Sequence, residues 1–363
     1  MFRKRIEKVE KLLAAKKLEG MLISSVSNIF YLTGFSNFSK DEREAYLFIT
    51  PKNTYIFTDA RYAEAVAKEV PHFQLHIITA KTPFITLLKN ICKKDHITSL
   101  GFEEDNITVW EYKRLQTVIP TLIPTSLHLR MQKDTEEIKK IQKACDMGDK
   151  AFSYALSHMK QGVSEKYIQV QIELFLKQQN ADVSFRPIVA FGSNASMPHY
   201  ESSPERKLRK NECILIDMGA KVTGYCSDMT RTIFFGKPTS EQKKIHQVVL
   251  DSQKKAIEYL KGQMKKGGEI RARDVDKISR DYIISKGYPS IPHSLGHGIG
   301  IDVHELPGLT PNSDLLLRTG MVFSIEPGIY LPDFMGVRIE DLVVLEQKTL
   351  KILTLSEREL VVL

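Results

Sequence analysis

Five residues of metal-binding type stand in the C-terminal half of the chain, each in an apolar or glycine-bound stretch. They are Asp217, Asp228, His297, Glu326 and Glu340. Burying an ionised carboxylate without a partner is costly, so acidic side chains rarely follow apolar runs such as Ile214–Ile216. A capping or ion-paired role would explain one such acid. Four carboxylates that converge in one core need positive charge to offset their repulsion, and the pattern therefore predicts a metal site.

The donor set is dominated by carboxylate oxygen, which favours Mn²⁺, with Co²⁺, Fe²⁺ or Zn²⁺ as possible substitutes. Five ligands can hold two metal ions if some carboxylates bridge. A water between two metals about 3.5–4 Å apart becomes hydroxide at neutral pH, and both metals can polarise a scissile carbonyl. A lone zinc ion with three protein ligands is the competing arrangement. It would leave carboxylates without a partner, so we predict two divalent metal ions per chain.

Three further histidines are placed for substrate chemistry rather than for the core. His199 lies in a loop opened by Gly192, while His293 and His304 flank the ligand candidate His297 along the chain. Histidine titrates near neutral pH, so it can stabilise an oxyanion or pass a proton to a leaving amine. A structural role is the alternative for each histidine taken singly. Together, the three are predicted to be functional.

The segment 293–300 resembles two familiar motifs but matches neither. His293 and His297 have the spacing of the zincin HExxH signature, but the glutamate is missing and the glycine-rich segment does not favour a regular helix. Gly296, Gly298 and Gly300 do not have the GxGxxG spacing of a nucleotide-binding loop, and no strand-to-helix context accompanies them. The segment is predicted to carry a metal ligand in a turn.

The elements expected to position these residues fall into two regions. Residues 1–127 alternate between helical and extended patterns, which predicts a compact α/β domain. Helices are expected at Arg5–Lys17, Arg61–Lys68 and Pro83–Cys92, and extended segments at Gly20–Ile23, Glu44–Thr50, Tyr55–Thr58, Phe73–Ile78 and Ile97–Phe102. This region has no catalytic constellation, so it is a candidate for shaping a pocket or an oligomer interface.

Residues 128–363 carry every candidate ligand. Asp134 and Glu137 have capping-box spacing and predict a helix that runs to about His158. Further helices are expected at Glu165–Gln179, Glu241–Lys261 and Ala272–Lys286. The two aspartates are placed on short strands joined by the polar turn Lys221–Gly224, and the two glutamates on strands joined across Pro332–Gly336. Two such strand pairs, each associated with helices, suggest an α+β domain with internal pseudo-symmetry.

The composition excludes several classes of protein. The 42% hydrophobic and 26% charged residues are typical of a globular protein, and no stretch has the roughly 18–20 apolar residues of a membrane span. The net charge is +8, but the lysines alternate with acids on helical faces and no nucleic-acid-binding motif is present, so nucleic acid is not expected as a partner. The N-terminus does not resemble a signal peptide. The four cysteines show no paired spacing, which predicts free thiols and a cytoplasmic location.

The stretches IDMG, SDMTRT, GHGIG, IEPGIY and RIED hold the five ligand candidates in the order Asp, Asp, His, Glu, Glu. In this they resemble the metallopeptidase family that contains aminopeptidase P, prolidase and methionine aminopeptidase, whose catalytic domain has the pita-bread fold. The resemblance covers residues 133–363. Residues 1–127 are similar to the creatinase/prolidase-like domain of the proline-directed branch, which methionine aminopeptidases usually lack. All five ligands are present, which disfavours a metal-free relative such as creatinase.

The resemblance implies a dinuclear exopeptidase that cleaves the bond between a first residue and a following proline. That bond is a tertiary amide without an N–H, which ordinary peptidases handle poorly. The positions that match His199, His293 and His304 line the substrate site in that branch, and the one that matches Arg338 supports the metal ligands. The position that matches Glu326 can also accept a proton from the bridging water. Short peptides with proline in second position are the expected substrates, and a homodimer is the expected assembly.

The choice between an Xaa-Pro aminopeptidase and an Xaa-Pro dipeptidase depends on Gly308. Some prolidases place an arginine shortly after the segment that matches His304–Pro307, where it can pair with the free carboxylate of a dipeptide. Glycine at position 308 favours an aminopeptidase that accepts longer chains, with prolidase activity as the alternative. Two other classes stay open: a metal-dependent hydrolase of a small non-peptide molecule, and a non-catalytic binding protein on the same fold.

Overall fold

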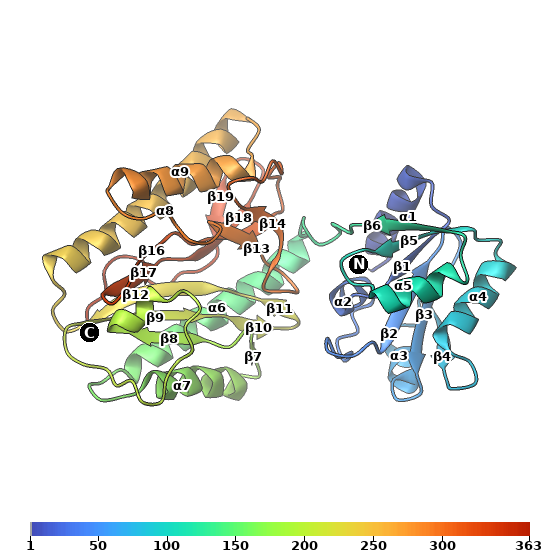
Figure 1. The fold of residues 1–363 in the computed structure, drawn as a ribbon, viewed down its shortest axis with the longest axis horizontal. Helices are drawn as coiled ribbons and strands as arrows, with labels where there is room; N and C mark the ends of the chain where they lie inside the picture. The colour runs from blue at the N-terminus through green and yellow to red at the C-terminus, as the bar shows by residue number, and fades with distance from the viewer. Residues whose placement is uncertain (1) are drawn as a thin grey trace. The chain divides into compact units, whose positions relative to one another are not determined.

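The computed structural model describes residues 2–363, and the chain divides after Arg130 into two compact units. Figure 1 shows the elements of each unit. The four cysteines are all buried, and among the described residues each one is a free thiol. None of the helices within residues 2–363 combines the length and apolar character needed to cross a membrane.

The N-terminal unit is built on one mixed sheet of six strands in the order β4-β3-β2-β1-β5-β6. The central strands β1 and β2 are antiparallel, whereas β5 and β6 extend the sheet in parallel from β1. The strands are β1 (Gly20–Ile23), β2 (Ala45–Ile49), β3 (Thr54–Asp59), β4 (Gln74–Ile78), β5 (Ser99–Glu103) and β6 (Thr121–Thr125). The helices are α1 (Phe2–Lys16), α2 (Val26–Thr33), α3 (Ala63–Glu69), α4 (Phe84–Lys94) and α5 (Val109–Gln116).

Strands β1 and β2 are buried on both faces, which explains their uninterrupted apolar sequences. Leu22, Phe48 and Leu100 share one cluster with buried residues of α4 and α5. The predicted α/β alternation is correct, but α2, α5 and β6 were not predicted. The capping box of Thr108 and Glu111 that begins α5 is a signal that the sequence did contain. Strand β6 is half exposed and contains a proline, so its pattern is weak.

The C-terminal unit holds four long helices and thirteen strands within residues 131–363. The helices are α6 (Thr135–Ser157), α7 (Glu165–Gln178), α8 (Ser240–Lys266) and α9 (Ala272–Ser285), with the short η1 at Gly192–Ser196. The strands are β7 (Asp182–Val183), β8 (Ile188–Phe191), β9 (Glu212–Met218), β10 (Ala220–Val222), β11 (Tyr225–Cys226), β12 (Met229–Phe235), β13 (Gly296–Gly298), β14 (Glu305–Leu309), β15 (Val322–Ile325), β16 (Gly328–Leu331), β17 (Met335–Arg338), β18 (Asp341–Leu345) and β19 (Leu350–Ile352).

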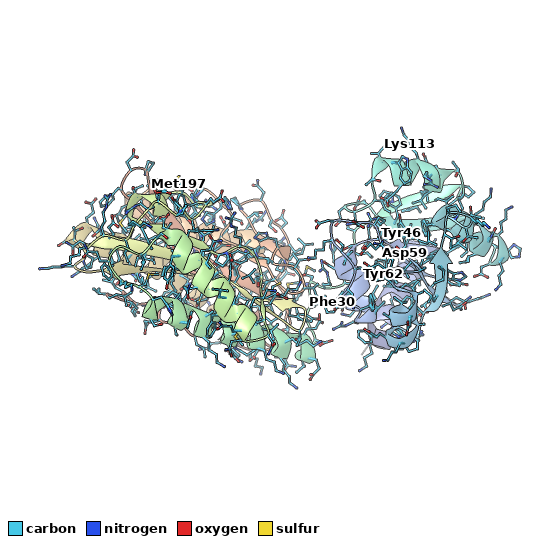
Figure 2. All side chains as sticks on the ribbon, turned by 90° about the horizontal axis from the view of Figure 1, so that it is seen from below. Phe30, Tyr46, Asp59, Tyr62, Lys113 and Met197 are labelled. Atoms are coloured by element: carbon cyan, nitrogen blue, oxygen red, sulfur yellow. The ribbon has the colours of Figure 1, made fainter. Side chains whose placement is uncertain are left out.

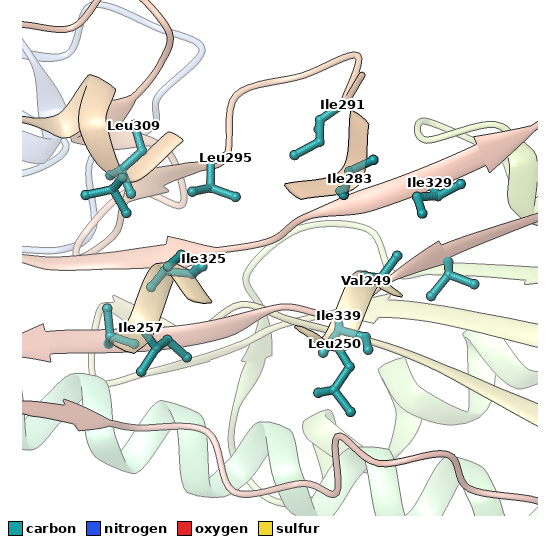
Figure 3. Packing of buried hydrophobic residues seen from close by; sticks show 14 of the residues in the cluster. Val249, Leu250, Ile257, Ile283, Ile291, Leu295, Leu309, Ile325, Ile329 and Ile339 are labelled. Carbon is teal, nitrogen blue, oxygen red and sulfur yellow. The ribbon is translucent and has the colours of Figure 1, made fainter. Parts of the chain in front are cut away.

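The helices of this unit form two pairs on opposite sides of the strands, with α6 and α7 on one side and α8 and α9 on the other (Figure 1). Strand β9 lies between the two cores. Ile214 and Ile216 pack in the cluster that includes α6 and α7, whereas Cys213 and Leu215 pack in the one that includes α8 and α9. Figure 3 shows part of this second cluster. Burial on both faces explains why the sequence before Asp217 is continuously apolar.

Each predicted pair of carboxylates flanks a hairpin instead of lying on its two strands: Asp217 and Asp228 flank β10 and β11, and Glu326 and Glu340 flank β16 and β17. Strands β10 and β11 are joined through Thr223 and Gly224, whose φ angles of 50° and 83° match the type I′ turn favoured by two-residue hairpins. Strands β16 and β17 are joined around Asp333, which has a φ of 59°. Helix α6 begins at the predicted capping box of Asp134 and Glu137. Helix α8 continues past the predicted end and stops at Gly267, whose φ of 68° lies in the left-handed region.

Candidate metal centre

Three of the four carboxylates lie where strands are interrupted rather than within them. Asp217 is inside β9, but Asp228 lies in the break between β11 and β12. Glu326 follows β15 directly, and Glu340 lies between β17 and β18. The prediction that each acid occupies a strand is therefore wrong for three of the four. At such a break the strand need not keep its pleat, so the side chain can turn from the sheet face towards the centre.

Side chains that flank both hairpins converge around His297, which lies in β13. The nearest ligand atoms of Asp228, His297 and Glu340 all lie within 4.8 Å of one another. His297 Nε2 is 3.6 Å from Asp228 Oδ2 and 3.3 Å from Glu326 Oε1. Asp217 reaches the same group through Arg338, whose Nη2 is 2.6 Å from Asp217 Oδ2. The geometry brings all five predicted ligands into one site.

One oxygen of each of three carboxylates is buried and accepts no hydrogen bond: Asp217 Oδ1, Asp228 Oδ1 and Glu340 Oε1. Such orphaned acceptors are expensive in a protein interior, and each is an atom that a cation would bind. Oxygen donors with one imidazole match the preferences of divalent metals such as Mn²⁺. The residues therefore fit a metal centre.

The pKa shifts of the carboxyl groups also indicate a site for a cation. Burial raises the pKa of Asp228 and of Glu340, and repulsion from neighbouring carboxylates adds to both shifts. Burial also raises the pKa of Glu326 to about 8, although Arg338 opposes that shift. Without a metal, these carboxyl groups resist ionisation. A bound cation would favour their ionised form, because it stabilises the negative charge.

Arg338 and Thr230 hold the carboxylates in place through hydrogen bonds. Arg338 is 4% exposed, and besides Asp217 its Nε donates to Thr230 Oγ1 at 3.0 Å. Thr230 Oγ1 in turn donates to Glu340 Oε2 at 2.7 Å. One buried cation thus links Asp217, beside the first hairpin, to Glu340, beside the second, through Thr230.

The ring of His297 is oriented by its own backbone. Nδ1 lies 3.1 Å from the carbonyl oxygen of Gly298, which leaves Nε2 facing the carboxylates. A second bond on the distal nitrogen is the usual way to fix a metal-binding imidazole. Ser324 accepts the His297 amide at 3.0 Å and donates to Glu326 Oε1 at 3.1 Å. Burial lowers the pKa of His297, which favours the neutral form that binds metals.

Two of the three predicted substrate histidines, His304 and His293, contact His297 and Tyr330 respectively. The rings of His297 and His304 meet edge to face with centroids 4.3 Å apart, and His304 is exposed. His293 Nε2 lies 2.9 Å from the hydroxyl of Tyr330, and burial lowers the pKa of His293 to about 4. His199 is exposed and lies in the loop that follows η1.

The loop of His199 is on the surface of the C-terminal unit. Met197, two residues earlier, is 48% exposed and is labelled in Figure 2. The backbone at Ala195 approaches Gly336 so closely that a side chain at that glycine would clash with it. This approach ties the loop after η1 to β17, the strand that carries Arg338.

Sequence reasoning missed Tyr330, Thr230 and Ser324. The Tyr330 hydroxyl accepts from Arg338 Nη1 at 2.9 Å and contacts His293, so it joins the substrate histidines to the metal ligands. One signal was available: Tyr330 follows Glu326 by four residues in an extended segment, where alternate residues share a face. Thr230 could have been found because strand pairing places it opposite Asp217.

Comparisons with known proteins cover the whole chain. Residues 5–132 match the creatinase/prolidase N-terminal domain, and residues 139–347 match metallopeptidase family M24. An Xaa-Pro dipeptidase from Pyrococcus horikoshii is 33% identical over 98% of both chains. The solved structure of an Xaa-Pro dipeptidase from Bacillus anthracis is 32% identical and superimposes with a TM-score of 0.90 over 100% of each chain. An X-Pro aminopeptidase from Thermotoga maritima is 30% identical, with a TM-score of 0.83 over 96% of this chain and 98% of its own.

These full-length matches confirm the expected fold, an N-terminal α/β domain followed by a pita-bread domain with internal pseudo-symmetry. They also confirm the enzyme class, since the family is one of metal-dependent hydrolases, and the family implies divalent metal ions. The chain belongs to metallopeptidase family M24, and it carries the creatinase/prolidase N-terminal domain.

Proposed function

We propose that this protein is an Xaa-Pro dipeptidase that uses two divalent metal ions, with Mn²⁺ as the expected metal. The ligands are Asp217, Asp228, His297, Glu326 and Glu340. The observation that carries the proposal is the set of three buried carboxylate oxygens without hydrogen-bond partners, two of them from Asp228 and Glu340 in the cluster with His297, which bound cations would satisfy. The relatives from Pyrococcus horikoshii and Bacillus anthracis, both described as Xaa-Pro dipeptidases, support the choice of substrate.

The comparisons favour the dipeptidase over the aminopeptidase that Gly308 suggested. A glycine at one position removes only one possible partner for the free carboxylate of a dipeptide. In the structure Gly308 pairs with His297 across β13 and β14, and a Cβ atom added at Gly308 would lie 3.6 Å from Thr310 Cγ2. Aminopeptidase activity remains the second candidate, because the aminopeptidase from Thermotoga maritima also matches nearly the whole chain.

When bound, the metal ions supply an acidic water as nucleophile and a Lewis acid for the scissile carbonyl. Glu326, whose Oε1 lies 3.3 Å from His297 Nε2, would be the carboxylate placed to take up the proton that such a water loses, once bound metal keeps it ionised. The bond that breaks joins the carbonyl carbon of the first residue to the proline nitrogen, and that nitrogen must gain a proton to leave. We assign His199, His293 and His304 to the substrate side of the site, where a histidine could deliver that proton or stabilise the oxyanion; the contacts of His304 with His297 and of His293 with Tyr330 support this assignment.

The test compares Xaa-Pro, the same dipeptide with an amidated C-terminus, and Xaa-Pro-Yaa. Metal-stripped protein with Mn²⁺ restored should cleave free Xaa-Pro best, and amidation should strongly reduce cleavage because the terminal carboxylate is lost. Xaa-Ala should be cleaved roughly 10–200-fold less well, the usual scale for a change of this size in an apolar pocket. Efficient cleavage of the amide and the tripeptide would instead identify an aminopeptidase. If no Xaa-Pro peptide were cleaved, the proposed function would be wrong.

A further inference from the structure

The segment 290–295, which connects α9 to β13 and carries His293, lies beside an ion pair on α9. Asp276 and Arg280 are one helical turn apart and form a bidentate pair. Arg280 Nη2 lies 2.8 Å from Asp276 Oδ1, and Nε lies 2.9 Å from Oδ2. The side chain of Asp276 is 1% exposed and that of Arg280 is 16% exposed. Such a pair fixes the guanidinium in one orientation as well as balancing charge.

Both members of the pair bind the segment. Arg280 Nη2 donates to the carbonyl oxygen of His293 at 3.0 Å, and Nη1 donates to Ser290 Oγ at 3.0 Å and to the carbonyl oxygen of Ile291. Asp276 Oδ1 accepts the amide of Leu295 at 3.2 Å. Backbone groups on both sides of His293 are therefore bound to this one ion pair.

Packing fixes the two ends of the segment but not its centre. Ile291 and Leu295 are 3% and 0% exposed and belong to the apolar cluster shown in Figure 3. Pro292 is exposed, and His293 is half-buried between these anchors. The carbonyl oxygen of Leu295 also accepts the amide of Glu326 at 2.8 Å. A shift of this segment would therefore move His293 and disturb the backbone of a candidate metal ligand together.

We propose that the Asp276–Arg280 pair is a positioning element that sets His293 at the substrate site. Neither residue is directed at the substrate; both act through the backbone of 290–295. The inference rests on the proposed function, because it takes His293 to be a substrate residue. Helix α9 and His293 thus belong to one polar network. His293 hydrogen-bonds to the hydroxyl of Tyr330, which in turn accepts a hydrogen bond from Arg338.

The experiment compares Arg280→Met and Arg280→Lys with the control Lys277→Met, all in the full-length chain. Lys277 forms the same i,i+4 ion pair on the same helix, with Asp281 at 2.5 Å, but its side chain is 72% exposed. Hydrogen exchange followed by mass spectrometry reports on the segment 290–297 without depending on activity. We expect faster exchange in both Arg280 variants and wild-type exchange in Lys277→Met. Arg280→Lys keeps a cation beside Asp276, so it guards against simple unfolding of the methionine variant.

Kinetics on Xaa-Pro with Mn²⁺ then test whether the effect passes through His293. Arg280→Met should lower kcat/KM by about 10²-fold, the scale of a misplaced substrate contact, with metal content unchanged. Arg280→Lys should lie between this value and wild type, because an ammonium lacks the planar fork. In a His293→Ala background, Arg280→Met should cost almost nothing further, since residues that act as one unit are not additive.

Wild-type exchange and kinetics in both Arg280 variants would overturn the inference. So would losses that multiply fully in the His293→Ala background, because those would indicate general destabilisation. If the wild-type protein cleaved no Xaa-Pro peptide, the proposed function would fail instead. The exchange comparison would still decide whether the ion pair holds the segment.

Discussion

At the scale of single residues, the metal centre depends on buried acids that are unfavourable without a cation. Replacing Asp228 with Asn, or Glu340 with Gln, removes a ligand charge and should reduce metal content and activity together. The same substitutions should stabilise the metal-free protein, because burial and mutual repulsion raise the pKa of both carboxylates. Elemental analysis and thermal unfolding after metal removal measure the two effects. Full activity at one metal per chain or fewer would contradict a dinuclear site.

His304 should behave differently from a ligand. Its ring packs edge to face on His297, but it lies on the exposed side of the site. His304→Ala should keep the metal content and lower kcat by about 10²–10⁴-fold, the usual range for a lost acid–base group. Steady-state kinetics beside elemental analysis separate the two roles. Near-normal turnover of Xaa-Pro by this variant would show that His304 has no catalytic part.

At the scale of secondary structure elements, Arg231 joins three separate parts of the C-terminal unit. From β12, its guanidinium contacts Asp341 Oδ1 at 2.6 Å, the carbonyl oxygen of Ser356 at 2.8 Å and the carbonyl oxygen of Glu340. The side chains of Arg231 and Asp341 are 2% and 0% exposed. This buried pair therefore fixes the backbone of Glu340, a candidate ligand, through the bond from Arg231 to its carbonyl oxygen.

Arg231→Met should lower the free energy of unfolding by about 3–5 kcal/mol, because it removes the buried cation of Asp341 and leaves only the longer contact with Arg358, at 3.8 Å. Lys254→Met is the matched control. Lys254 also contacts the C-terminal segment, through Glu359 at 2.8 Å, but both side chains are about half exposed. Exposed pairs contribute about 0–1 kcal/mol. Urea unfolding of the two variants should show this difference, and equal losses would contradict the role given to burial.

At the scale of the whole molecule, the site should make stability depend on pH. The folded-state pKa of Glu326 is about 8, above its ordinary value of 4.5, so the unfolded chain releases this proton first. The contribution of Glu326 to the stability of the metal-free protein is therefore lost as pH rises from about 4.5 to about 8. Bound metal should reverse the trend, because ligands must be deprotonated to bind it.

Urea unfolding of the metal-free wild type and of Glu326→Gln, at pH 5 and pH 8, measures this contribution. The difference between the two proteins cancels other titrating groups. Among these is the buried His246, whose pKa burial lowers to about 4, so it reduces stability as pH falls below 6.5. The wild type should lose more stability than the variant between pH 5 and pH 8. A pH-independent difference would show that Glu326 is not perturbed in the folded protein.

The sequence by itself identified the candidate donor residues, the turn between β10 and β11 and the family. Acids that follow apolar runs, such as Asp217 after Ile214–Ile216, stand out because burial of a carboxylate is so costly. The hairpin turn at Thr223 and Gly224 could be predicted because its backbone conformation depends on local residue types. These features depend on residues that are neighbours in the sequence, so they can be predicted from short stretches of it.

Only the tertiary structure decided which residues support the site. Arg338 and Asp217 are 121 positions apart, and Thr230 and Glu340 are 110 apart, so no periodicity links either pair. Asp276 and Arg280 read in sequence as an ordinary helical ion pair, like the exposed Lys277 and Asp281 on the same helix. What distinguishes the two pairs is burial against the segment that carries His293. Burial of that kind arises from packing between distant elements and cannot be inferred from spacing along the chain.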